Sequence, residues 1–138
     1  MAYHIGDYIK FPLRASAVLT NAYVTYPINE TLSDGTTGIF DCSGFNQLLV
    51  YTNFTIGSLT SASIKVEFSA DNVTWYQETL LAISGGTSTD SLGVHLYGAS
   101  GNYRLALPVA DRYIRVSITG TGTVTNSLAV LDAILARV

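Results

Sequence analysis

Short segments in which apolar and polar residues alternate recur along this chain. The clearest is residues 64–69, Ile-Lys-Val-Glu-Phe-Ser, whose period of two predicts a strand with one buried and one exposed face. Residues 103–107 and 113–118 alternate in the same way. Residues 47–56 are rich in Leu, Val, Tyr and Phe, which predicts a strand buried on most of its surface.

Turn-forming residues separate these segments at intervals of roughly 8 to 12 residues. Glycine, serine, asparagine and aspartate dominate the breaks, which we place at residues 33–35, 71–72, 84–88, 98–102 and 119–122. Regularly spaced short strands are typical of all-β folds. We therefore expect an antiparallel all-β fold with about eight strands, either a sandwich or a barrel.

The two ends of the chain allow more than one interpretation. Residues 1–14 contain several aromatic side chains and little alternation, and we assign them to an N-terminal arm. Such an arm could be a first strand, a frayed end or a strap on a neighbouring subunit. Residues 15–138 then form a single sandwich domain, since the length suits one domain. Residues 128–138 fit either a helix face or a strand, and the lack of a helix cap favours the strand.

Charge is scarce in this sequence. Hydrophobic residues make up 48% of the chain and charged residues 12%, and the latter is about half of the usual share. A net charge of −3 with 7 Lys and Arg argues against nucleic acid as a partner. A monomer relies on surface charge for solubility, so this composition predicts a chain that buries surface against partners.

Targeting and membrane signals are equally lacking in the sequence. No apolar run reaches the roughly 18 residues that a membrane span needs, so we expect no membrane partner. Asp7 and Lys10 interrupt the stretch that a signal peptide would require. We therefore expect synthesis in the cytoplasm without a signal peptide.

Residue types that carry catalysis or bind metals form no motif in this sequence, and the ten Asp and Glu residues are scattered. His4 lies in the arm and His95 in a short strand, while Cys42 has no second cysteine with which to form a disulfide. The glycine-rich stretches match neither a phosphate-binding loop nor a dinucleotide-binding turn. We expect no enzyme activity, no catalytic residues, no cofactor and no metal site, with His95 at the surface or in an interface and Cys42 as a small buried residue.

Two segments carry the strongest local signature. Residues 69–75 read Ser-Ala-Asp-Asn-Val-Thr-Trp, and residues 112–116 read Arg-Tyr-Ile-Arg-Val. This hairpin and strand resemble those of discoidin-type jelly-roll sandwiches, many of which bind carbohydrate or lipid through loops at one end. The resemblance implies that the fold is an antiparallel β-sandwich, jelly-roll-like, with about eight strands. It also implies an alternative function, a carbohydrate-binding or adhesion module. Trp75 or Tyr76 would then contact the glycan together with loop residues around 84–91.

The same hairpin, the Tyr-Arg strand and the following Gly-Thr-Gly turn also resemble small all-β virion proteins of tailed bacteriophages. This resemblance implies a capsid decoration, or cement, protein on the capsid surface of the virion. The partners would be the major capsid protein or another virion component, and copies of the chain itself in a homo-oligomer, for example a trimer. We expect assembly contacts at Tyr3, His4, Tyr8 and Phe11. A phage neck or tail accessory protein is the second alternative.

Overall fold

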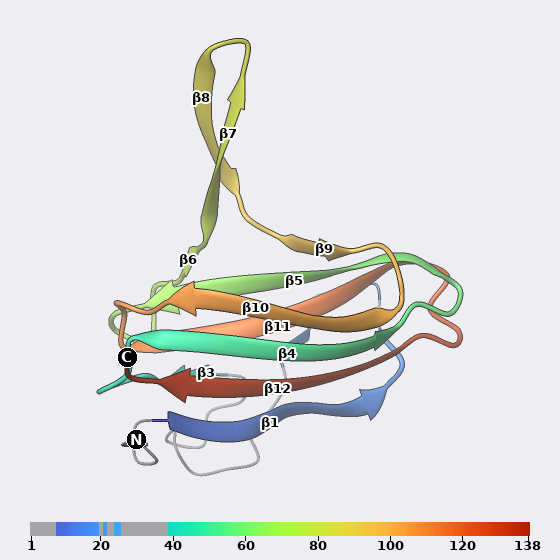
Figure 1. The fold of residues 1–138 in the computed structure, drawn as a ribbon, viewed down its shortest axis with the longest axis horizontal. Helices are drawn as coiled ribbons and strands as arrows, with labels where there is room; N and C mark the ends of the chain where they lie inside the picture. The colour runs from blue at the N-terminus through green and yellow to red at the C-terminus, as the bar shows by residue number, and fades with distance from the viewer. Residues whose placement is uncertain (1–7, 20, 22–23, 26–38) are drawn as a thin grey trace, which may run out of the picture.

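Two antiparallel sheets pack face to face in the computed structural model of the chain, which describes residues 8–19, 21, 24–25 and 39–138 (Figure 1). The first, sheet A, has the order β1-β12-β4-β10. Its strands are β1 (Tyr8–Ala17), β12 (Leu128–Ala136), β4 (Gln47–Thr55) and β10 (Gly101–Pro108). The central strand β4 pairs along its length with β10 on one side and β12 on the other.

The second sheet, sheet B, is built around β11 (Tyr113–Gly122) and β5 (Leu59–Ser69), which pair over nearly their full length. The break expected at residues 119–122 is therefore wrong, because these residues continue β11 and pair with β5. Two short strands lie along the free side of β11, namely β2 (Val24–Thr25) and β3 (Ile39–Asp41). Two more lie along the free side of β5, namely β6 (Tyr76–Gln77) and β9 (His95–Tyr97). β2 and β3 together occupy one strand position beside β11, and β6 and β9 together occupy one beside β5. Sheet B therefore also has four strand positions.

The path of the chain between the two sheets is that of a jelly roll. From β1 the chain passes to sheet B at β2 and β3, returns at β4, crosses to β5, β6 and β9, and then alternates through β10, β11 and β12. Eight strand positions in two four-stranded sheets with these crossings define the double-sheet jelly roll. The expected antiparallel, jelly-roll-like sandwich is therefore confirmed.

Alternate side chains of the long strands fill the space between the sheets, as the period of two requires. Every second residue of β4 is buried, and so is every second residue of β12. The largest fully buried side chains come from both sheets and include Leu48, Val50, Phe54, Ile64, Val66, Ile114, Ile118, Leu131 and Leu135. Burying such side chains contributes about 1.5–3 kcal/mol each, so this layer supplies the main stabilisation.

Both ends of the described chain are strands of sheet A. Residues 8–14, which the sequence led us to place in an arm, lie in β1 and pair with β12, corresponding to the first-strand alternative. Residues 1–7 lie outside the described residues. The strand favoured for residues 128–138 is confirmed, because β12 has a hydrogen-bonding partner on each side. A segment so flanked gains two ladders, whereas an eleven-residue helix without a cap is marginal.

A two-stranded hairpin projects from the sandwich (Figure 1). It consists of β7 (Thr79–Ser84) and β8 (Thr87–Leu92), which pair with each other and form a sheet of their own. Gly85 and Gly86 make the turn with φ of 58° and 79°, the left-handed conformations that a two-residue hairpin turn demands. The loop expected at residues 84–88 is thus corrected to a two-residue turn between paired strands.

Candidate functional site

The hairpin presents its most exposed apolar side chains on one of its faces, while Leu80, 41% exposed, lies on the other. Cross-strand pairing places Thr79 with Leu92, Leu81 with Asp90 and Ile83 with Ser88 on this face. Leu81, Ile83 and Leu92 are 63%, 71% and 68% exposed, and we call these three residues the apolar hairpin face. Asp90 is the sole charged residue between positions 79 and 92. Clustered exposed apolar side chains mark surfaces that meet another molecule.

The base of the hairpin is held by a compact set of hydrogen bonds. The backbone N–H of Gly93 donates to the carbonyl of Glu78 at 2.7 Å, and the N–H of Glu78 donates to Val66 of β5 at 3.1 Å. The side-chain amide of Gln77 donates to the carbonyl of Gly93 at 3.0 Å. His95 Nε2 lies 2.8 Å from Glu78 Oε1, and both side chains are largely buried. These contacts fix where the hairpin leaves the sandwich.

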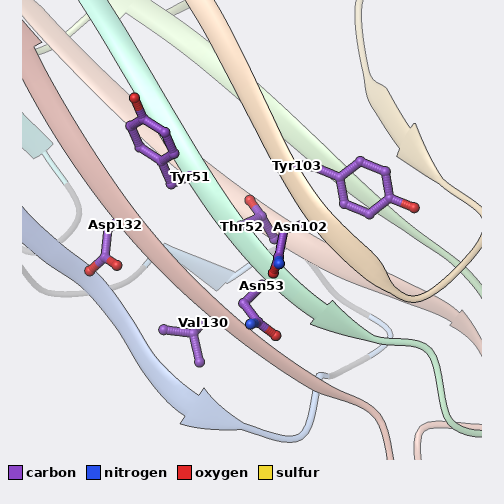
Figure 2. A pocket seen from close by; sticks show the side chains of 7 residues that line it. All are labelled: Tyr51, Thr52, Asn53, Asn102, Tyr103, Val130 and Asp132. Carbon is purple, nitrogen blue, oxygen red and sulfur yellow. The ribbon is translucent and has the colours of Figure 1, made fainter.

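A shallow depression lies on the opposite sheet, on the outer face of sheet A (Figure 2). Its volume is about 210 Å³. The lining residues come from β4, β10 and β12 and are Tyr51, Thr52, Asn53, Asn102, Tyr103, Val130 and Asp132. In the strand register Tyr51 stands between Arg104 of β10 and Asp132 of β12, so a tyrosine ring lies between two opposite charges.

A third cluster lies on the outer face of sheet B. The Arg115 guanidinium makes two 3.0 Å hydrogen bonds to the carboxylate of Glu67 and lies 4.4 Å from the ring centroid of Trp75. Lys65 is a second cation near Glu67, at 3.5 Å. Partial burial acts to raise the pKa of Glu67, but the Arg115 hydrogen bonds and both positive charges outweigh it, so this pKa is lowered.

The expected turn at residues 71–72 positions this tryptophan. Asn72 has φ of 62°, and the Asp71 carboxylate accepts the backbone N–H groups of Val73 and Thr74 at 2.9 and 2.8 Å. These hydrogen bonds lower the pKa of Asp71. The chain then returns with Trp75 against Arg115 and with Tyr76 68% exposed. One ring face of the tryptophan is therefore covered, and the exposed aromatic of this pair is Tyr76.

The residues expected to mediate assembly lie at the start of the chain. Tyr3 and His4 lie outside the described residues. Tyr8 and Phe11 lie in β1, opposite Ala136 and Ala133 of β12. Whether these four residues contact a partner stays a prediction.

His95 and Cys42, the two other residues singled out from the sequence, both pack within the fold. His95 begins β9 and contacts Glu78 at the hairpin base. Cys42 is buried, and burial together with the charges of Asp41 and Asp111 raises the pKa of its thiol to about 12. No cluster of three potential ligands among His, Cys, Asp and Glu occurs in the part of the chain that the structure describes. Within that part, no helix is long and apolar enough to cross a membrane.

The apolar hairpin face was missed by sequence reasoning. Gly85-Gly86 between an aliphatic run and a Thr-Ser-rich run is a hairpin signal, and it could have located the two strands. The depression around Tyr51 had no comparable signal, because three strands distant in sequence form it.

No protein-family model matches the chain, and no curated protein sequence matches it. Among solved structures, the crystal structure of murine APRIL is similar over 91% of this chain and 97% of that one, with 8% sequence identity and a TM-score of 0.43. A likeness at this level says nothing about what the chain binds.

Proposed function

We propose that this chain is a structural virion protein of a tailed bacteriophage, namely a capsid decoration protein that stabilises the head shell through protein–protein contacts. The observation that carries the proposal is the hairpin, which extends Leu81, Ile83 and Leu92 from a well-packed jelly roll into solvent. Jelly rolls are common in viral capsids. A virion protein of this kind would have its exposed apolar side chains covered by neighbouring subunits.

The mechanism of such a protein is physical. The sandwich supplies a rigid body, and the hairpin and the outer sheet faces supply contacts. Contacts that form only on the assembled shell stabilise it by mass action. Many copies bound to one shell multiply a modest affinity for each contact. The low charge of the chain fits surfaces that meet protein neighbours, since the centres of interfaces are depleted in charged residues.

The proposal is tested by cosedimentation with purified phage head shells that lack their decoration protein. We expect the protein to sediment with shells and to raise the temperature at which they disassemble. The variant Ile83→Asp should bind more weakly, while Thr89→Asp on the other hairpin face should bind as the wild type does. A protein that stays monomeric and leaves every shell tested unchanged would refute the proposal. Binding to isolated necks or tails, in place of heads, would favour a neck or tail accessory protein.

Tyr76 supports the second candidate, a carbohydrate-binding module. Its ring is 68% exposed at the hairpin base, where it could stack on a sugar ring. A glycan array separates the two functions. Binding that is lost in Tyr76→Ala and kept in Ile83→Asp would establish the module. An empty array would remove this candidate.

A further inference from the structure

We propose that the apolar hairpin face of one copy docks on the outer face of sheet A of a second copy, with Ile83 entering the depression beside Tyr51 and Val130. The inference deepens the proposed function, because it names the contact by which the expected homo-oligomer forms. It rests on that function only for the expectation that copies associate.

The two surfaces are placed so that they cannot meet within one chain. The hairpin leaves the sandwich between β6 and β9, at an edge of sheet B, and points away from the body (Figure 1). The depression lies over β4, β10 and β12 on the outward side of the other sheet (Figure 2). A second copy can bring its hairpin to this depression.

The shapes and chemistry of the surfaces match. An apolar cavity of about 150 Å³ is large enough to bind benzene, so a depression of about 210 Å³ has room for the branched side chain of isoleucine. Tyr51 and Val130 supply apolar contact area in it, and Leu49 and Ile134 extend the apolar surface along the same strands. The hairpin offers Ile83 near its tip, flanked on the same face by Leu81.

The charges of the two surfaces also complement each other. Asp90 is the cross-strand neighbour of Leu81, and Arg104 is the cross-strand neighbour of Tyr51. Neither charge has an ion-pair partner within the described part of the chain. Arg104 and Asp132 flank Tyr51 on opposite sides. We therefore assign the docked orientation that brings Asp90 toward Arg104 and away from the like charge of Asp132. Such pairs at an interface steer association and fix its register.

The contact joins two different patches, so it is a head-to-tail interface. Interfaces of this type close into rings when the rotation between copies allows. In a closed ring every hairpin is docked and every depression is filled. An isolated two-stranded hairpin is marginally stable in water. Docking would therefore also stabilise the pairing of β7 with β8.

Mixed cysteine cross-linking tests the contact directly. The full-length variants Ile83→Cys and Val130→Cys are purified separately, mixed and treated with copper phenanthroline, and the wild-type Cys42 is too deeply buried to interfere. We expect a disulfide-linked dimer in the mixture and little in either variant alone. The matched control Thr89→Cys, on the opposite hairpin face, should not cross-link to Val130→Cys. Equal cross-linking of Ile83→Cys alone, or none in the mixture, would overturn the inference.

Charge exchange gives an independent readout. Asp90→Arg and Arg104→Asp should each weaken self-association in analytical ultracentrifugation by roughly tenfold or more, since each reversal replaces an attraction across the interface by a repulsion between like charges. The double variant Asp90→Arg/Arg104→Asp should recover most of the affinity. If recovery fails, the proposed register is wrong. Shell binding without the cross-link would leave the proposed function standing and the docking contact refuted, while the cross-link without shell binding would do the reverse.

Discussion

Nε2 of His95 lies 2.8 Å from Oε1 of Glu78, and this contact closes the base of the projecting hairpin. Glu78 immediately precedes β7, and His95 begins β9 after the hairpin has returned. The contact therefore joins the two chain segments that carry the apolar hairpin face. It sets the direction in which Leu81, Ile83 and Leu92 are presented.

Removing this contact should loosen the hairpin without unfolding the sandwich. In His95→Ala, a hydrogen bond of about 1 kcal/mol is lost at the hairpin base, while the cores of β4 and β5 are untouched. We expect faster hydrogen exchange at the amides of residues 79–92 and little change in Tm. Glu78→Gln, which keeps an acceptor oxygen for His95, should exchange more slowly than His95→Ala. Unchanged exchange in His95→Ala would show that backbone hydrogen bonds alone hold the hairpin.

Two glycines with similar backbone angles should differ in their tolerance of alanine. Gly57 has φ of 54°, and a Cβ there would lie 2.5 Å from the backbone oxygen of Asn126. Gly85 has φ of 58° but open space around it. Each alanine costs about 1–2 kcal/mol for the left-handed conformation, and Gly57→Ala adds the clash. Denaturant unfolding should show a clearly larger loss for Gly57→Ala than for Gly85→Ala, and equal losses would contradict the packing between residues 57 and 126.

The pKa of Glu67 gives the stability a specific pH dependence. Because this pKa is lowered in the folded state, the carboxylate contributes stability above its ordinary value of 4.5 and loses that contribution as the pH falls below it. Asp41 and Asp71 also have lowered pKa values and act in the same direction. We expect Glu67→Gln to be less stable than the wild type at neutral pH and to lose less stability on acidification. Parallel curves of Tm against pH would show that Glu67 contributes nothing.

Cys42 should be inert in the folded protein. The thiolate is the reactive form of cysteine, and a thiol whose pKa is raised to about 12 by burial and by the charges of Asp41 and Asp111 is almost fully protonated near pH 8. Ellman's reagent should label it slowly before unfolding and quickly afterwards. The exposed thiol of Ile83→Cys provides the control for reagent activity. Rapid stoichiometric labelling of the native wild type would contradict the burial of Cys42.

Local sequence patterns were sufficient to predict a strand where that strand is regular and half buried. The alternation of residues 64–69 located Val66 in the core, and the apolar run of residues 47–56 located β4. The burial expected over most of the surface of residues 47–56 is wrong, because only every second residue of β4 is buried. These signals are local because successive side chains of a strand face opposite sides of the sheet. The all-β class followed from the number and spacing of such segments. The jelly-roll type followed from the resemblance of residues 69–75 and 112–116 to discoidin-type sandwiches.

Other features could not be predicted from local sequence patterns, and each has a physical reason. Residues 8–14 showed little alternation because β1 contains register shifts on both sides of Arg14, and a bulge breaks the period of two. The strand β8 reads Thr-Ser-Thr-Asp-Ser-Leu, so its hydroxyl-rich composition indicated a loop. The contact between His95 and Glu78 spans 17 residues and depends on the turn at residues 85–86. The depression at Tyr51 depends on three strands from distant parts of the chain.

Sedimentation equilibrium of the wild type, Ile83→Asp and Thr89→Asp at matched concentrations tests the central claim, that the apolar hairpin face is an assembly surface. The two substitutions add the same charge to opposite faces of one hairpin, and only Ile83→Asp removes an apolar side chain from the apolar hairpin face. We expect the wild type and Thr89→Asp to associate with increasing concentration and Ile83→Asp to remain monomeric with an unchanged Tm. Identical association of all three proteins, or a monomeric wild type, would contradict the claim.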